Sequence, residues 1–160
     1  MTIVVLALGA NLGDRLANLR TAVSMLEKAG LTVSSRSEVW ETAPVPAGQP
    51  AYLNAALVAE TELTPLELLA LVKRIERDLG RRPGRRWGSR PADIDILFFG
   101  ELEMASEALT IPHPRIAERS FVLAPLSDVW IGPLPVLGRP ASELLEAVGM
   151  EGAWRTGERL

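Results

Sequence analysis

Apolar residues near the start of the chain follow two patterns in turn. Residues 3–8 form an unbroken apolar run, which predicts a buried strand. Over residues 13–29, leucine and valine recur at intervals of three and four, which predicts a helix with one apolar face that ends at Gly30. Residues 31–42 mix apolar and polar positions, and we interpret them as a second strand.

The same order of strand and helix follows a proline-rich loop. Residues 52–63 predict a third strand. Thr64 can cap the next helix, because a proline follows it and Glu67 stands three positions after the cap. Gly80 ends this helix, and residues 92–99 form an apolar run that predicts a fourth strand.

The predicted elements therefore have the order β-α-β-β-α-β. This order is typical of an α+β, ferredoxin-like fold, in which helices pack on an antiparallel sheet. Further helices, expected at about 115–128 and 140–148, would add a helical C-terminal extension. At this length we expect residues 1–160 to form a single domain.

Composition excludes several classes of protein. Hydrophobic residues make up 48% of the chain, yet no segment approaches the roughly 20 apolar residues of a membrane helix. The absence of cysteine excludes disulfides, thiolate zinc sites and cysteine nucleophiles, and it suits the cytoplasmic location that we expect. The net charge of −3 gives no general attraction to nucleic acid or to acidic membranes.

Positive charge is concentrated in one segment. Residues 81–90 contain five arginines and no acidic residue. Arginine binds phosphate oxygens with paired hydrogen bonds, so the segment could bind a phosphorylated ligand. A solvated surface or a patch for polyanions is the alternative.

Two carboxylates follow in the fourth strand. Asp93 and Asp95 are two residues apart, so they share a face of the strand, with Cα atoms about 6.6 Å apart. Leu97 and Phe99 are expected on that face too. The opposite face, toward the helices, should hold Ile94, Ile96 and Phe98. Carboxylates at this spacing can hold one or two hard cations, although they could also lie on a solvated sheet face.

Four other polar or aromatic residues could contact a ligand. Trp87, within the arginine segment, could cover a flat heterocycle or fill the core. Tyr52 and Asn54 share a strand face, and the amide could either bind the edge of a heterocycle or belong to a turn. His113 is flanked by prolines and could donate to a phosphate or serve only in the turn.

Five stretches of sequence occur in an order that identifies a family. Across residues 7–126 they are ALGANLGDR, YLNAALVAET, IERDLGR, RWGSRPADIDILFFGE and LTIPHPRIAERSFVLAPL. Together they closely resemble the 6-hydroxymethyl-7,8-dihydropterin pyrophosphokinase family of folate biosynthesis. The resemblance implies Mg²⁺-dependent transfer of the terminal diphosphate of ATP to the pterin hydroxymethyl group, with release of AMP. The implied partners are these small molecules and neither nucleic acid nor a membrane, and we expect a monomer.

The resemblance also implies a role for individual residues. The residues implied in catalysis are Arg81, Arg90, Asp93 and Asp95, of which the two aspartates would bind two Mg²⁺ ions. The implied ATP site comprises Lys73, Glu76, Arg81, Arg86, Arg90, Ile96, Thr110, His113 and Arg119. The implied pterin pocket comprises Thr42, Ala43, Val45, Tyr52, Asn54, Trp87 and Phe121. Loops 42–50 and 81–91 would close over the two substrates.

The chain departs from the family pattern at some positions. Lys73 replaces a glutamine and Ala43 replaces a proline, whereas Ala108 and Pro114 stand where Arg and Tyr occur elsewhere. These changes concern ligand contacts and leave both aspartates in place. Two other interpretations remain: a nucleotidyltransferase, which would release pyrophosphate, and a ferredoxin-like RNA-binding module. The RNA-binding module would carry aromatic pairs on its central strands, where this chain has aliphatic and acidic residues.

Overall fold

The computed structural model contains both strands and helices, and it describes residues 1–43, 48, 50–80, 91–150 and 152–160. The main sheet contains β1 (Thr2–Ala10), β2 (Thr32–Arg36), β3 (Glu38–Thr42), β4 (Tyr52–Thr61), β5 (Asp93–Phe99) and β8 (Ala153–Arg159). The helices are α1 (Arg15–Lys28), α2 (Pro65–Asp78), α3 (Ser120–Val129) and α4 (Ala141–Val148). A 3-10 turn, η1 (Ile116–Glu118), precedes α3, and β6 (Met104–Ala105) pairs with β7 (Thr110–Ile111).

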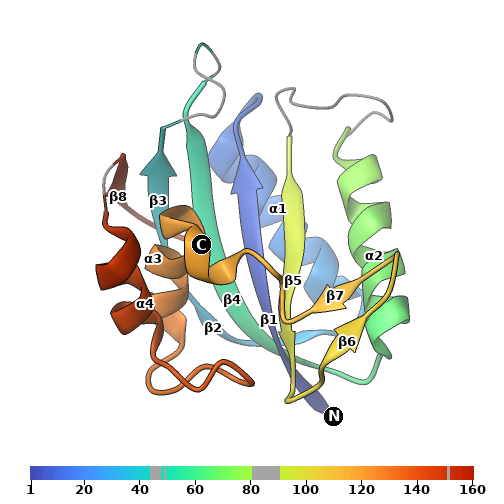
Figure 1. The fold of residues 1–160 in the computed structure, drawn as a ribbon. Coiled ribbons are helices and arrows are strands. Elements are labelled where there is room, and N and C mark those ends of the chain that lie inside the picture. The colour runs from blue at the N-terminus through green and yellow to red at the C-terminus, as the bar shows by residue number, and fades with distance from the viewer. Residues whose placement is uncertain (44–47, 49, 81–90, 151) are drawn as a thin grey trace.

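The main sheet has the order β5-β1-β4-β3-β8, and β2 also pairs with β4. All of these pairs are antiparallel. The helices α1 and α2 cover one face of the sheet, and α3 and α4 cover the other (Figure 1). This arrangement confirms the predicted ferredoxin-like α+β class.

The helix starts follow from their capping residues. The side chain of Thr64 accepts a hydrogen bond from the backbone N–H of Glu67, and the Glu67 carboxylate accepts one from the N–H of Thr64. This is the predicted capping box. Helix α1 begins at Arg15 and not at residue 13, because the Asp14 side chain accepts from the N–H of Ala17 and acts as the cap.

Two parts of the strand prediction were wrong. The strand expected over 31–42 is divided at Ser37, whose hydroxyl accepts from the N–H of Ala56 and donates to the carbonyl of Glu38. The C-terminal extension is not only helical, because β8 pairs with β3 at the edge of the sheet. Most residues of β8 are exposed, so its sequence lacks the apolar alternation that would have predicted it.

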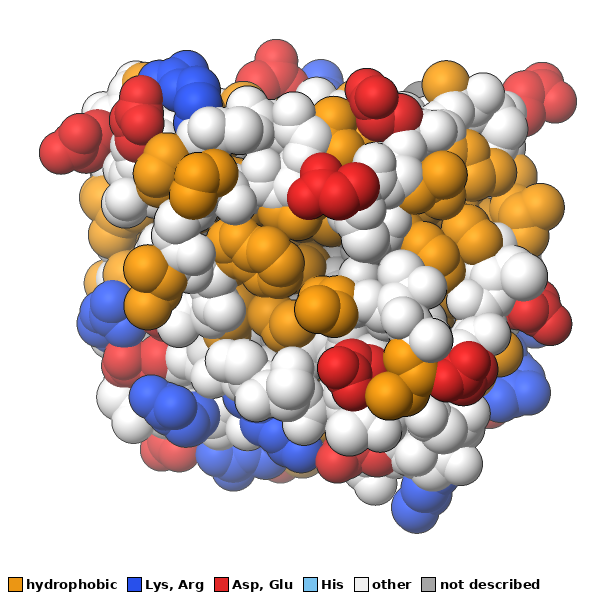
Figure 2. Space-filling model, turned by 90° about the horizontal axis from the view of Figure 1, so that it is seen from below, with side chains coloured by type: hydrophobic (Ala, Val, Ile, Leu, Met, Phe, Trp, Pro, Cys, Tyr) orange, Lys and Arg blue, Asp and Glu red, His pale blue; other side chains and the backbone are white. Residues whose placement is uncertain are grey.

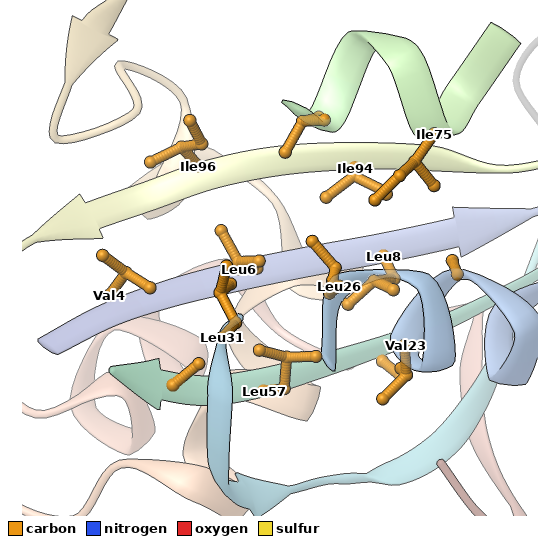
Figure 3. Packing of buried hydrophobic residues seen from close by; sticks show 14 of the residues in the cluster. Val4, Leu6, Leu8, Val23, Leu26, Leu31, Leu57, Ile75, Ile94 and Ile96 are labelled. Carbon is orange, nitrogen blue, oxygen red and sulfur yellow. The ribbon is translucent and has the colours of Figure 1, made fainter. Parts of the chain in front are cut away.

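The hydrophobic core has one part on each face of the sheet. Figure 3 shows the part beneath α1 and α2, where Leu6 and Leu8 of β1 point toward Leu26 of α1. The other part lies beneath α3 and α4 and contains Val5 of β1 and Leu123 of α3. Each face of β1 is therefore buried, as its apolar run predicted.

The last side chains of β5 face other sides of the sheet than expected, because the pairing of this strand shifts in register. The pairing of β1 with β5 is irregular between Val5 and Leu6, so Leu97 has no partner in that ladder. Phe98 consequently joins Leu97 in the core beneath α3, and Phe99 joins the core beneath α1 and α2. The assignment of Phe98 to the side of Ile94, and of Phe99 to the side of the aspartates, was wrong.

The N-terminal end of β1 lies at the bottom of the molecule in Figure 1, and Figure 2 views it from that side. Apolar side chains gather there in groups separated by acidic and other polar surface (Figure 2). No helix in the described part of the chain has the length and apolarity needed to cross a bilayer. The opposite end of β1, where residues 7–9 lie, borders a cavity of different chemistry.

Candidate functional site

A cavity of about 420 Å³ lies between the sheet and the start of α3. Strands β1, β3, β4 and β5 form its floor. Its lining residues are Ala7, Leu8, Gly9, Thr42, Ala43, Tyr52, Asn54, Asp93, Asp95, Arg115, Arg119, Phe121 and Val122. The cavity therefore brings together residues predicted for the pterin pocket with residues predicted for the metal and ATP sites.

The two aspartates of β5 line one side of the cavity, as their spacing predicted. Burial raises the pKa of Asp95 to about 7, and the negative charge of Asp93 adds to the rise. The guanidinium of Arg119 opposes this effect on the pKa. We refer to Asp93, Asp95, Arg115 and Arg119 as the charged half of the cavity. The carboxylate of Asp93 lies close enough to oppose ionisation of Asp95.

Glu76 supports the same strand from the side of α2. Its side chain is 1% exposed, and one carboxylate oxygen accepts a hydrogen bond of 2.9 Å from the N–H of Ile94, between the two aspartates. The Lys73 Nζ lies 3.5 Å from the other oxygen. Burial raises the pKa of Glu76, and the Ile94 N–H opposes the rise. Glu76 thus fixes the backbone that carries the aspartates and does not line the cavity.

His113, a predicted ATP residue that follows β5 in the chain, lies in a turn beside that strand. The His113 N–H donates to the carbonyl of Leu97 at 3.0 Å, which fixes the turn against β5. Its Nδ1 accepts from the N–H of Arg115, so in the neutral ring Nε2 carries the proton. Burial lowers the pKa of His113, and the charge of Arg119 lowers it further. His113 is therefore a neutral donor at ordinary pH.

Two other predicted ATP residues lie away from the cavity wall. The Ile96 side chain is 4% exposed and belongs to the core beneath α1 and α2. Thr110 is exposed on β7. Neither lines the cavity, so a contact between ATP and either residue stays a prediction.

The opposite side of the cavity combines an amide, a hydroxyl and two aromatic rings. The Asn54 Nδ2 donates to the Thr42 Oγ1 at 2.6 Å, and both residues are less than 10% exposed (7% and 5%). Tyr52 and Phe121 complete this side, and the Arg119 guanidinium lies 5.4 Å from the centre of the Phe121 ring. We refer to Thr42, Tyr52, Asn54 and Phe121 as the ring half. Its fixed amide and aromatic surfaces suit a flat, polar-edged ligand.

Some predicted site residues lie outside the described residues. They are Val45, Arg81, Arg86, Trp87 and Arg90. Their roles stay predictions. Ala43, which is described, lines the cavity, and its N–H donates to the carbonyl of Gly152 just before β8.

Sequence reasoning missed several lining residues. Arg115, just before η1, and Val122 of α3 reach the cavity only through tertiary packing. Ala7 belongs to the apolar run of residues 3–8, which predicts a buried strand, and Gly9 lies beyond the predicted end of that strand, although β1 extends to Ala10. A glycine inside a strand often marks a close approach by a ligand or another chain, and this signal could have identified Gly9.

The residues that line the cavity lie within a stretch that matches a known protein family. Residues 5–131 match the model of the 7,8-dihydro-6-hydroxymethylpterin-pyrophosphokinase family. The chain belongs to this family. That stretch includes every lining residue of the cavity, and β8 lies beyond it.

Curated pyrophosphokinases from bacteria match most of the chain. The 2-amino-4-hydroxy-6-hydroxymethyldihydropteridine pyrophosphokinase of Bacillus subtilis is 47% identical over 129 residues, which cover 79% of this chain and 77% of that protein. The enzyme of the same name from Methylorubrum extorquens is 41% identical over 157 residues, covering 94% and 98% of the two chains. The second alignment extends the likeness beyond the stretch matched by the family model.

Longer relatives contain the family domain as one part. The mitochondrial folate synthesis bifunctional protein of Pisum sativum is 50% identical over 127 residues, which are 79% of this chain but 25% of that protein. This chain thus spans about a quarter of the length of that relative. The structure of Plasmodium falciparum HPPK-DHPS with pteroate superposes with a TM-score of 0.76 at 15% identity, over 96% of this chain and 47% of the other. At that identity the superposition supports the fold alone.

Proposed function

We propose that this pyrophosphokinase transfers the terminal diphosphate of ATP to the hydroxymethyl group of 6-hydroxymethyl-7,8-dihydropterin. The hydroxymethyl oxygen would bond to the β-phosphorus of ATP. The bond from that phosphorus to the oxygen that bridges it to the α-phosphorus would break, AMP would leave with the bridging oxygen, and the hydroxyl proton would pass to solvent. This is phosphoryl transfer chemistry with the reacting centre one phosphate further in.

One observation carries the proposal: the two halves of the cavity have different chemistry and face the same space. The ring half has an amide held by a hydroxyl and two aromatic rings, which suits the edge and faces of a pterin. The charged half has carboxylates and guanidinium groups, which suit a metal-bound triphosphate. A shared cavity would place the hydroxymethyl group of one ligand beside the phosphates of the other.

The carboxylates of the charged half fit Mg²⁺. The raised pKa of Asp95 shows that the charge of this carboxylate is poorly compensated in its buried position beside Asp93. In the described part of the chain, no group of three or more His, Cys, Asp or Glu residues could hold a metal ion. Mg²⁺ commonly takes one or two carboxylates and completes its coordination with phosphate oxygens and water. Asp93 and Asp95 would hold two Mg²⁺ ions, which when bound would neutralise charge on the triphosphate.

The remaining residues would act by positioning. The Asn54 amide would bind the edge of the pterin, and Tyr52 and Phe121 would bind its faces. Arg119 and the Nε2–H of His113 would donate to phosphate oxygens. Holding the two reactants in line and stabilising the phosphate charge would supply most of the acceleration. The predicted roles of Arg81 and Arg90 in catalysis belong to this proposal as well.

The decisive assay measures the products. Purified protein is mixed with ATP, Mg²⁺ and 6-hydroxymethyl-7,8-dihydropterin, and the nucleotides are separated by chromatography. We expect AMP and pterin diphosphate in equal amounts, with no product when EDTA replaces Mg²⁺. Release of ADP would indicate an ordinary kinase, and release of pyrophosphate would indicate a nucleotidyltransferase; either result would exclude the proposed reaction.

We further propose that the enzyme acts as a cytoplasmic monomer. The absence of cysteine and the small-molecule substrates support this assignment. Light scattering coupled to size-exclusion chromatography should give the mass of one chain, 17.3 kDa. A mass of twice that value would exclude the monomer.

A further inference from the structure

Gly9 lies where the two halves of the cavity meet. In the sheet, β1 runs between β4 and β5, and Gly9 is opposite Asn54 on one side and Asp93 on the other. Neighbouring strands are about 4.8 Å apart, so the backbones that carry the amide and the carboxylate are separated by roughly 10 Å. Gly9 is the residue between them on the floor of the cavity.

The space above Gly9 is too small for a side chain. A Cβ atom at this position would lie 3.1 Å from the Asn54 Oδ1 and 3.7 Å from the Tyr52 Cδ1. The first distance is tighter than an ordinary contact, so the amide would have to move by a few tenths of an ångström. The 2.6 Å bond from Asn54 to Thr42 would then be lengthened or reoriented.

Backbone conformation does not explain the glycine. Gly9 lies within a regular ladder and lacks the positive φ of glycines such as Gly13 and Gly30. Glycine weakens a strand interior, where β-branched residues are favoured. Its presence in the central strand therefore indicates a need for space.

The same face of β1 becomes less bulky toward Asn54. Val5 is buried in the core beneath α3, and Ala7, two residues further on, lines the cavity and lies opposite Asp95. Gly9 follows two residues later and leaves only backbone. The floor is therefore deepest beside the amide that would bind a ring.

We propose that Gly9 is a specificity-determining residue: the absence of its side chain leaves room for the Asn54 amide and so keeps that amide aimed at the edge of a flat ring. The inference deepens the proposed function and rests on it for the identity of the ring. An added methyl group would turn the amide away from the ring, and it would leave the charged half unchanged. Gly9 would thus act on pterin binding and not on ATP binding.

The test uses Gly9→Ala in the full chain. We expect the variant to fold, with a melting temperature equal to that of the wild type or higher, because alanine suits a strand better than glycine. The KM for the hydroxymethyldihydropterin should rise at least tenfold, and the KM for ATP should stay within twofold. A purely structural role would change both constants or lower the melting temperature. Either of these results, an unfolded variant, or an unchanged pterin KM would overturn the inference.

A double-mutant cycle with Asn54→Ala shows whether the effect passes through the amide. In the Asn54→Ala background, adding Gly9→Ala should raise the pterin KM by less than threefold, because no amide remains to be displaced. A further tenfold rise in that background would contradict the role of the amide.

Equilibrium binding separates this inference from the proposed function. The probe is 6-hydroxymethylpterin, whose own fluorescence reports binding without turnover. If the wild type binds the probe at least tenfold more tightly than Gly9→Ala but produces no AMP, the inference stands and the proposed reaction fails. If the wild type produces AMP and both proteins bind the probe equally, the inference fails and the reaction stands.

Discussion

The charged half and the ring half of the cavity are built in different ways. Asp93 and Asp95 are neighbours on one face of a single strand, so local spacing alone brings their carboxylates together. Asn54 and Phe121 come from β4 and α3, 67 positions apart in the sequence, and meet only because α3 packs on the sheet. The carboxylates of the charged half are brought together by strand geometry, and the ring half is assembled by the tertiary fold.

The two halves also differ in their electrostatic state. Burial of Asp95 and the like charge of Asp93 raise the pKa of Asp95, so the ionised carboxylates of the charged half are destabilised without a cation. In the ring half, the amide of Asn54 already has a hydrogen-bond partner in Thr42. The charged half should therefore depend on its ligand for stability, whereas the ring half should be preorganised for binding. A substitution in one half of the cavity should therefore change the binding of one substrate only.

The largest effect should come from Asp95→Ala. Loss of a carboxylate that would hold the metal–triphosphate complex should lower kcat by about a thousandfold or more, since this charge would stabilise the transition state. The circular dichroism spectrum should match that of the wild type. Glu146→Ala, which removes an exposed acid from α4, is the control and should leave kcat unchanged. Near-normal turnover by Asp95→Ala would refute the metal assignment.

A smaller effect, confined to the ring half, is expected from Asn54→Ala. A site built to hydrogen-bond the edge of a ring loses much of its affinity when the bonding group is removed. We expect the pterin KM to rise about 10- to 100-fold, with the ATP KM within about twofold. Steady-state kinetics with each substrate varied in turn provides the measurement. Equal rises in both constants would mean that the two halves do not bind separate substrates.

The stability of the metal-free protein should depend on Asp95. Its folded-state pKa of about 7 is above the ordinary value of 3.8, so the fold favours the protonated form. This stabilising contribution is complete below about pH 4 and is lost as the pH rises through about 7. At pH 8 in EDTA, Asp95→Asn should therefore raise the free energy of unfolding, by about 2 kcal/mol.

Urea denaturation of both proteins, with EDTA and with Mg²⁺, measures this difference. Mg²⁺ should stabilise the wild type more than Asp95→Asn, because only the wild type keeps both carboxylates. If Asp95→Asn is less stable than the wild type in EDTA at pH 8, then the charge of Asp95 is compensated by the protein itself.

The smallest effect should come from Arg155→Ala at a distance from the cavity. Arg155 of β8 forms ion pairs with Glu38 and Asp128, and its guanidinium lies 4.3 Å from the centre of the Trp40 ring. Arg155 thus links β3, which carries Thr42, to α3 through these two ion pairs. Because Arg155 is half exposed, its loss should cost only about 1 kcal/mol. The pterin KM should rise by about two- to threefold, with the ATP KM unchanged.

Arg139→Ala is the matched control for this variant. Arg139 is equally exposed and forms an ion pair with Glu143 within a single segment near α4. Its removal should cost less than about 0.5 kcal/mol and leave both KM values unchanged. Thermal denaturation and kinetics of the two variants, measured side by side, test the effect of β8. Indistinguishable variants would show that β8 does not support the ring half.

Much of the fold could be predicted because its signals are local. The apolar run of β1, the helical spacing in α1 and the capping box of α2 each need only a few neighbouring residues. The β-bulge at Leu97 and the edge strand β8 could not be predicted. A bulge depends on the partner strand, and an exposed edge strand has little apolar pattern.

The same distinction applies to the site. The spacing of Asp93 and Asp95 predicted a shared face, which the structure confirms. The residue pattern suggested a heterocycle contact for Asn54 but left a turn role open, and Phe121 was assigned to a pterin pocket only through resemblance to a family. Arg115 was missed altogether, because it reaches the cavity from the turn before η1, where no sequence pattern reports on its distant neighbours. Local periodicity therefore predicts the two carboxylates of the charged half and leaves its arginines and the ring half to tertiary packing.

The most direct test of the two-half cavity is a crystal structure with 6-hydroxymethylpterin, Mg²⁺ and an ATP analogue whose α–β bridge is a methylene group. We predict that the pterin edge lies against Asn54, with the ring between Tyr52 and Phe121, and that the phosphates lie beside Asp93 and Asp95. The hydroxymethyl oxygen should face the β-phosphorus. A pterin bound outside the ring half, or phosphates bound away from the two aspartates, would contradict the account.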